Sequence, residues 1–234
     1  MTETSLLIWR IWASPDAPNE EIHENVISAS RDPHDTATTI MPQIAKDSLM
    51  TLEAYAKARN AFRAKVMKHK EQRCVQLGES VTLHFEDELT IRYQVQEMLR
   101  IERIFEDEGI QDELNAYNPL IPDGTNLKAT MMIEYPDVEE RHRMLAKLKG
   151  IEDRVWVQVA GCARVNAIAD EDLERENAEK TSSVHFLRFE LTEEMREWLR
   201  RGAGLAMGID HPQYRVSLDR VPEEVRGALT GDLA

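Results

Sequence analysis

Short apolar segments with the length of β-strands limit what this chain can fold into more than any other feature. Most of them alternate apolar and polar residues and lie close to a Gly or Pro turn, so that one strand is often followed directly by another. We predict strands in CVQLGESVTLHFE (74–86, a hairpin turning at Gly78) and at 130–135, 155–160, 164–169, 184–191, 204–209 and 214–218, with Gly161 turning the second hairpin. Strands joined by hairpins favour an α+β fold with a largely antiparallel sheet.

Two long helices are predicted near the start of this fold. Residues 47–73 carry a helical pattern with Asp47 or Thr51 available as N-cap, and residues 88–108 carry a second one that we expect to stop at Gly109. A short helix at 111–117 follows. Further helices fit at 137–149, 170–178, 192–201 and 222–229. We therefore expect an N-terminal pair of long packed helices beside the sheet.

Residues 1–40 differ from the rest of the chain because no helical or strand period persists in them. Acidic and small polar residues crowd this segment, which is typical of disordered chains. We predict a disordered N-terminal extension at 1–40 and a single α+β domain at 41–234. The alternative is an overlong start, with Met41 as the true initiator.

Composition excludes several classes of protein. The formal net charge is −14, which disfavours nucleic acid and anionic membranes as partners. Only two cysteines are present, so there is no disulfide framework, and a reducing cytoplasm is the simplest location. No apolar run reaches the roughly 20 residues of a membrane span. Common catalytic and nucleotide-binding signatures are absent, no cofactor is predicted, and whether the protein is an enzyme stays open.

Glu102 is out of place on the predicted helix at 88–108. At about 100° per residue it lies inside the apolar stripe, with Glu106 near the edge of the stripe, whereas Glu97 lies on the opposite, solvated face. The stripe consists of Ile91, Val95, Met98, Leu99, Ile101 and Phe105.

Arg59 and Arg63 present the complementary problem on the helix at 47–73. They lie within an apolar stripe formed by Leu52, Tyr55, Ala56, Phe62 and Val66. An unpaired buried charge costs several kcal/mol, so we expect the two helices to pack together with Glu102 bonded to Arg59 or Arg63. The cluster is then either a sealed ion-pair network or the lining of a ligand pocket that includes Arg59, Arg63, Glu102 and Glu106.

His185 alternates with Leu187, Phe189 and Leu191 and should share the buried face of its strand. A hydrogen-bonded core histidine is one interpretation, and a ligand-binding residue is the other. A metal site would require His185, His211 and Glu102 to converge, which sequence spacing does not indicate, and no metal site is predicted.

Several long stretches resemble an uncharacterised bacterial domain-of-unknown-function family. They include LEAYAKAR (52–59), YQVQEMLRIERIFEDEGIQDELNAYNPLIPDG (93–124), IEDRVWVQV (151–159), IADEDLERE (168–176), SVHFLRFEL (183–191) and GIDHPQY (208–214). The resemblance covers the chain from about residue 46 to 229. It implies association with rubrerythrin-like di-iron proteins and an iron–sulfur oxidoreductase, and it transfers no catalytic residue.

Three hypotheses about function follow. The first is a non-enzymatic accessory or partner protein of a redox or peroxide-handling module, with rubrerythrin-like or iron–sulfur proteins as partners. The second is a small-molecule-binding enzyme with an Arg/Glu-lined pocket that includes His185. The third is a protein that binds a metal through carboxylates and His185.

Overall fold

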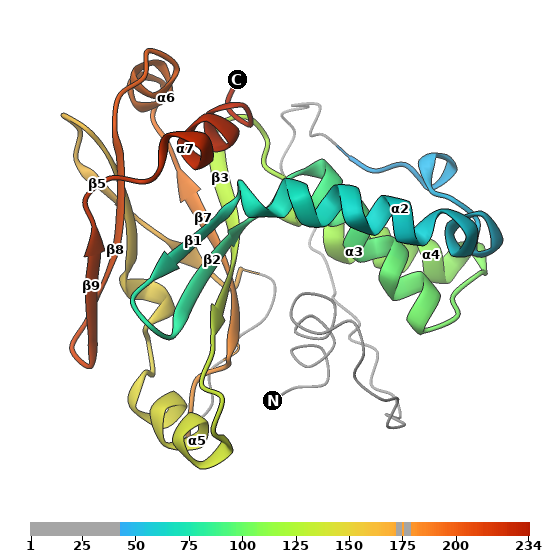
Figure 1. Cartoon of the computed structure of the whole chain (residues 1–234), viewed down its shortest axis with the longest axis horizontal. Helices are drawn as coiled ribbons and strands as arrows, with labels where there is room; N and C mark the ends of the chain where they lie inside the picture. Colours follow the sequence, from blue (N-terminus) through green and yellow to red (C-terminus); the bar gives the residue numbers. More distant parts are fainter. Residues whose placement is uncertain (1–42, 172–174, 176–178) are drawn as a thin grey trace, which may run out of the picture. The chain divides into compact units, whose positions relative to one another are not determined.

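The computed structural model describes residues 43–171, 175 and 179–234, which are coloured in Figure 1. The predicted extension at 1–40 lies outside these residues. In the described part the fold is mixed α and β, and its strands form two antiparallel sheets. The predicted α+β class is thus confirmed, although the strands are divided between two sheets where one was expected.

Sheet A has five strands in the order β1-β2-β3-β7-β6, and sheet B has four in the order β5-β4-β8-β9. Every strand pair in both sheets is antiparallel. The strands are β1 (Cys74–Leu77), β2 (Val81–Phe85), β3 (Asn126–Ile133), β4 (Val155–Val159), β5 (Arg164–Asn166), β6 (Ile168–Ala169), β7 (Val184–Glu190), β8 (Leu205–His211) and β9 (Tyr214–Leu218).

The main hydrophobic core lies between the two sheets. Alternate residues of each strand enter it, as the period of two along a strand requires. Apolar side chains from α5 (Val138–Lys147), α6 (Glu193–Arg200) and α7 (Glu223–Thr230) complete this core. These three helices confirm the helical patterns predicted near 137–149, 192–201 and 222–229.

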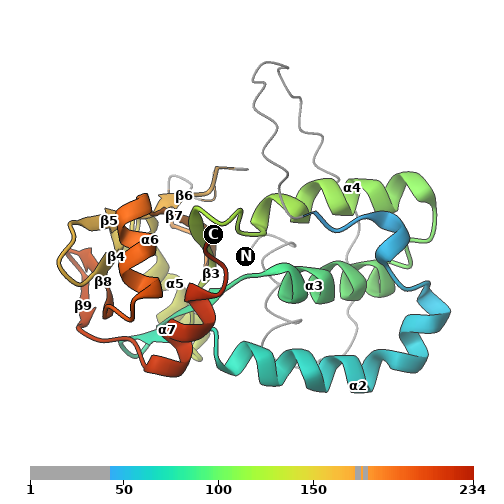
Figure 2. The ribbon, with the colours of Figure 1, turned by 90° about the horizontal axis from the view of Figure 1, so that it is seen from above.

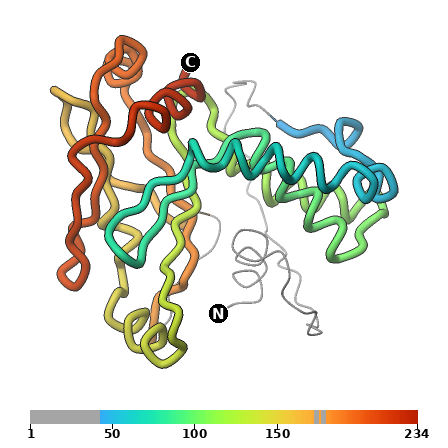
Figure 3. The backbone as a smooth tube through the Cα atoms, in the orientation of Figure 1, coloured from blue at the N-terminus to red at the C-terminus, as the bar shows by residue number. Residues whose placement is uncertain are grey.

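Three further helices form a second group of elements: α2 (Leu52–Glu71), α3 (Glu88–Ile101) and α4 (Asp107–Tyr117). Figure 2 shows α3 between α2 and α4, and it contacts both. The chain leaves sheet A after β2, passes through α3 and α4, and returns as β3, as the tube in Figure 3 shows. Short 3-10 turns lie before α2 (η1, Lys46–Ser48), after α4 (η2, Asn118–Leu120) and between α5 and β4 (η3, Glu152–Arg154).

The caps of α2 and α3 follow from the sequence. Thr51 accepts a hydrogen bond from the amide of Ala54, as its predicted N-cap role requires. Asp87 and Thr90 bond each other's backbone amides at the start of α3, which forms a capping box. Both helix starts are therefore fixed by local chemistry.

The second predicted helix ends earlier than expected. Helix α3 stops at Ile101, Arg103 adopts a positive φ of 55°, and the amide of Ile104 bonds the carbonyl of Leu99 at 2.9 Å. This is a Schellman ending with arginine at the left-handed position that glycine usually occupies. Gly109, the expected stop signal, lies inside α4.

One predicted strand divides between the two sheets. Residues 164–166 form β5 and pair with β4 in sheet B, as the hairpin at Gly161 predicts, but residues 168–169 form β6 and pair with β7 in sheet A. The chain therefore crosses between the sheets within a few residues. This crossing delivers Asp170 to the strand that carries His185.

Two remaining expectations concern helices. The helix predicted at 170–178 falls largely outside the described residues, and Asp170 itself has a φ of 49°, which is not helical.

In the part of the chain that the structure describes, no helix is both long enough and apolar enough to cross a membrane.

Candidate functional site

An ion-pair cluster does join α2 and α3, but its carboxylate is Glu97. Arg59 donates Nε to Oε1 of Glu97 at 2.8 Å and Nη2 to Oε2 at 2.9 Å. The Tyr55 hydroxyl donates to Oε1 at 2.6 Å, and Arg100 donates to Oε2 at 3.0 Å. Glu97 is only 2% exposed. A carboxylate with this bidentate partner and two further donors is a paired structural charge.

The prediction that Glu102 pairs with Arg59 or Arg63 is wrong. Glu102 is exposed at the C-cap of α3, and among the described residues no hydrogen bond or ion pair joins it to either arginine. Glu106 is likewise exposed, at the N-cap of α4. The prediction assumed that α3 buries one apolar stripe, but α3 packs against α2 and α4 together. Nearly its whole circumference is therefore buried.

Arg63 takes a separate partner. It is half-buried and interacts with the hydroxyl of Tyr93, where it partly offsets the rise in the Tyr93 pKa that burial causes. The structure thus keeps Arg59 and Arg63 at the interface of α2 and α3 and leaves Glu102 and Glu106 outside it. A ligand-binding role for these four residues stays a prediction.

His185 forms the centre of a different, buried cluster. Its side chain is fully buried, which confirms the predicted inward orientation on β7. Nδ1 lies 2.6 Å from Oδ2 of Asp170. Nε2 lies 3.0 Å from the hydroxyl of Thr181, 3.1 Å from the carbonyl of Ser182 and 3.9 Å from Oε2 of Glu152. Both ring nitrogens therefore face oxygen atoms.

Four separate segments build this cluster. Glu152 comes from η3, just before β4, and Asp170 comes directly after β6. Thr181 precedes β7, and its amide bonds the carbonyl of Leu145 at the end of α5 at 3.2 Å. The residues meet because β6 crosses to sheet A and pairs with β7, which places Asp170 beside the backbone of the strand that carries His185.

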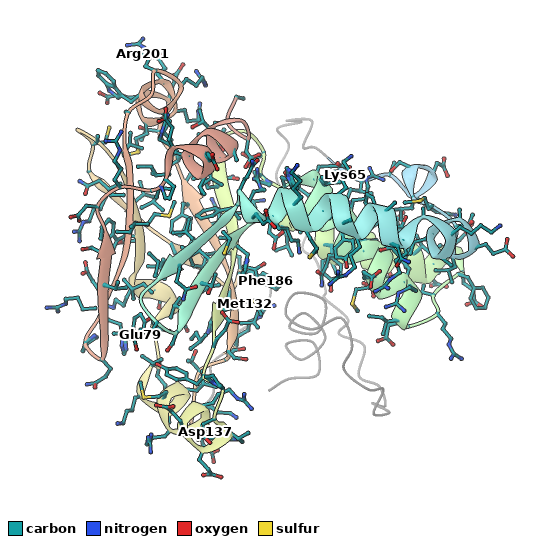
Figure 4. All side chains as sticks on the ribbon, in the orientation of Figure 1. Lys65, Glu79, Met132, Asp137, Phe186 and Arg201 are labelled. Carbon is teal, nitrogen blue, oxygen red and sulfur yellow. The ribbon has the colours of Figure 1, made fainter. Side chains whose placement is uncertain are left out.

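Asp170 is held more firmly than a surface carboxylate. Its amide donates to the carbonyl of Phe186 at 2.9 Å, and its Oδ1 accepts the Phe186 amide, also at 2.9 Å. Arg175 donates to the same Oδ1 at 3.1 Å, and its guanidinium lies 4.5 Å from the centre of the Phe186 ring. Figure 4 shows Phe186 near Met132 of the neighbouring strand β3. The positive φ at Asp170 is compatible with aspartate, which tolerates this region better than most residues.

The donor set of this cluster suits a metal ion. In the described segments, one oxygen each from Glu152 and Asp170 and one nitrogen of His185 all lie within 4.8 Å of one another. Imidazole and carboxylate ligands favour manganese, iron or zinc over softer ions. The cluster also admits a purely structural interpretation, because Asp170 is already paired with Arg175 and with Nδ1 of His185.

His211 and Glu102, whose convergence with His185 the sequence did not indicate, lie outside this cluster. His211 accepts the amide of Gln213 on Nδ1 at 3.2 Å and faces the carbonyl of Lys149 through Nε2 at 3.1 Å. Those bonds explain it as a structural histidine that fixes the turn at the end of β8. Sequence reasoning missed Glu152 and Asp170 because no local spacing connects them with His185, and it missed Thr181 although that residue lies only four positions before His185.

A concave feature lies on sheet B, apart from the His185 cluster. An open groove of about 560 Å³ runs over the outer side of β4, β8 and β9, with Trp156, Arg164 and Arg220 among its lining residues. The Arg164 guanidinium lies 3.7 Å from the centre of the Trp156 ring and pairs with Asp210 at 2.7 Å. The two most distinctive groups of this groove are thus already engaged with each other.

Comparisons with known proteins give a family without an assigned activity. A family model described as "Protein of unknown function (DUF3501)" matches residues 43–233. A crystal structure of a novel protein of unknown function from Burkholderia pseudomallei K96243 is 55% identical in sequence, with a TM-score of 0.79, and the match covers 82% of this chain and 100% of that one. No curated protein matches the chain.

Proposed function

Since the chain belongs to the DUF3501 family of proteins of unknown function, we propose a function from its own residues: it binds a divalent metal ion at the buried cluster of Glu152, Asp170 and His185. The observation that carries this proposal is the convergence of three potential ligand atoms within 4.8 Å, from η3, from the residue directly after β6 and from β7. Only nitrogen and oxygen donors are present, so manganese, iron and zinc are the ions of choice.

Burial strengthens the case. Two carboxylates and an imidazole are removed from water here, and a divalent ion would be a strong partner for them in addition to Arg175. The side chains of Glu152 and Asp170 are only 10% and 9% exposed, and His185 is fully buried. A divalent ion would add two positive charges where two carboxylates already face one another across the imidazole.

The experiment measures metal content and metal-induced stabilisation. The purified full chain is analysed for bound elements and then melted with and without Mn²⁺, Fe²⁺ or Zn²⁺. At an ion concentration of about 100 times the Kd, binding adds about 2.7 kcal/mol, which corresponds to a rise in Tm of roughly 5–10 °C for a chain of this size. We expect close to one ion per chain.

Matched variants locate the site. His185→Gln and Glu152→Gln should abolish the stabilisation by metal, whereas His211→Gln should keep it, because His211 is also a buried histidine but lies in a separate turn. A wild-type protein that carries no ion and shows no shift in Tm with any of the three metals would refute metal binding. The cluster would then be a structural ion-pair network.

The wider role that we propose is that of a metal-binding accessory protein in a cytoplasmic redox or peroxide-handling module. The proposal is motivated by the association with rubrerythrin-like and iron–sulfur proteins that the sequence resemblance implies, and both cysteines are free thiols. Co-purification of a tagged chain with di-iron or iron–sulfur proteins tests this role. Recovery of the chain without any such protein would contradict it.

A further inference from the structure

The residues of this cluster have different roles in binding the ion. This assignment of roles rests on the proposed metal binding. We infer that the ion is bound by Nε2 of His185, Oε2 of Glu152 and the hydroxyl of Thr181. Asp170 is then a positioning residue, which holds the imidazole through Nδ1 and does not touch the ion.

The first argument is the spacing on the Nε2 side. Nε2 of His185, Oγ1 of Thr181 and Oε2 of Glu152 form a triangle with sides of 3.0, 3.4 and 3.9 Å. A point equidistant from its three corners lies about 2.0 Å from each, which matches the 2.0–2.2 Å bonds of zinc to nitrogen and oxygen. The spacing of these three atoms is therefore compatible with one bound ion.

A fourth oxygen lies on the same side of the ring. The carbonyl of Ser182 is 3.1 Å from Nε2, close to the separation of neighbouring ligands around an ion with bonds of about 2.1 Å. The ligand set is then one imidazole nitrogen, one carboxylate, one hydroxyl and one backbone carbonyl.

The Nδ1 side has no comparable space. Nδ1 and Oδ2 of Asp170 are 2.6 Å apart, which is a short hydrogen bond, whereas two ligands of one ion lie about 3 Å or more apart. Oδ1 of Asp170 is occupied by the amide of Phe186 and by Arg175. A carboxylate that accepts Nδ1–H from a metal-binding histidine fixes the tautomer and the ring orientation, and its loss typically weakens metal affinity 10–100-fold.

The experiment compares three variants with the wild-type chain by titration with Zn²⁺ and Mn²⁺. Asp170→Asn should keep one ion per chain and bind it about 10–100-fold more weakly, because the amide keeps an acceptor for Nδ1–H but loses the charge. Thr181→Val should weaken binding, and Thr181→Ser should restore it, because only the hydroxyl is needed. Circular dichroism confirms that each variant is folded.

A nitrogen NMR spectrum of the zinc-loaded chain, labelled with ¹⁵N-histidine, gives an independent readout. The His185 signal, identified by its absence in His185→Gln, should show a protonated Nδ1 and a zinc-bound Nε2. Zinc on Nδ1, together with complete loss of the ion in Asp170→Asn, would overturn this assignment while metal binding itself stands. If the wild-type chain binds neither ion, the proposed function fails and this inference falls with it.

Discussion

Glu97, and not the predicted Glu102, pairs with Arg59, and this difference gives the sharpest test of the fold. Glu97→Ala removes a buried carboxylate that accepts hydrogen bonds from Arg59, Tyr55 and Arg100. Removal of one partner from a buried ion pair typically costs 3–5 kcal/mol, because the remaining charge and donors lose their compensation. Glu102→Ala is the matched control, since its exposed side chain should change stability by less than about 0.5 kcal/mol.

A second estimate of the magnitude comes from the pKa of Glu97. Burial by itself would raise this pKa, but the hydrogen bonds from Arg59, Tyr55 and Arg100 outweigh that effect and lower the pKa to about 2. A depression of roughly 2.5 units from the ordinary value corresponds to about 3 kcal/mol of stability at neutral pH. The free-energy cost expected for Glu97→Ala therefore agrees with the stabilisation that follows from the pKa shift.

The sign of the pH dependence follows from the direction of the shift. Because the folded pKa is depressed, the contribution of Glu97 is complete above the unfolded pKa of about 4.5 and is lost as the pH falls toward 2. The stability gap between wild type and Glu97→Ala should therefore narrow by about 1.4 kcal/mol between pH 7 and pH 3.5.

Urea denaturation of wild type, Glu97→Ala and Glu102→Ala at pH 7 and pH 3.5 measures these quantities. We expect Glu97→Ala to lower the midpoint without a change in the m-value, which signals lost stability in an unchanged fold. A cost below about 1 kcal/mol for Glu97→Ala, or a larger cost for Glu102→Ala, would refute the reasoning.

Three further predictions concern other parts of the chain. Burial lowers the pKa of Lys70 from 10.5 to about 8, so the folded chain loses this proton at a lower pH than the unfolded chain. The free energy of unfolding of the wild type should therefore rise relative to that of Lys70→Met by about 2–3 kcal/mol between pH 8 and 10.5, and a constant difference would contradict this expectation. Tyr214→Phe should cost about 1–2 kcal/mol in urea denaturation, because the hydroxyl donates to the carbonyl of Leu77 at 2.7 Å and accepts the amide of Ser80 at 3.1 Å; an unchanged midpoint would show that water replaces it. A chain that starts at Met41 should melt within about 5 °C of the full chain, and a larger drop would make the first 40 residues part of the domain.

Much of the fold could be read from local patterns, because local physical rules act within a few residues. Alternation along 184–191 placed His185 on the buried face of β7, and Gly161 marked the hairpin of β4 and β5. The cap at Thr51 follows from a side-chain hydrogen bond, and the hairpin at Gly78 follows from a positive φ of 74°. These features need no information about distant residues.

Tertiary structure alone decided which charged residues are buried. A helical stripe assumes one apolar face, but α3 packs against both α2 and α4, so Glu97 is enclosed while Glu102 lies beyond the end of the helix. The cluster around His185 depended on β6 crossing from one sheet to the other, which brings Asp170 to His185 across 15 residues, while Glu152 and His185 meet across 33. No periodicity encodes such a contact, because its free energy comes from packing among segments that are distant in sequence.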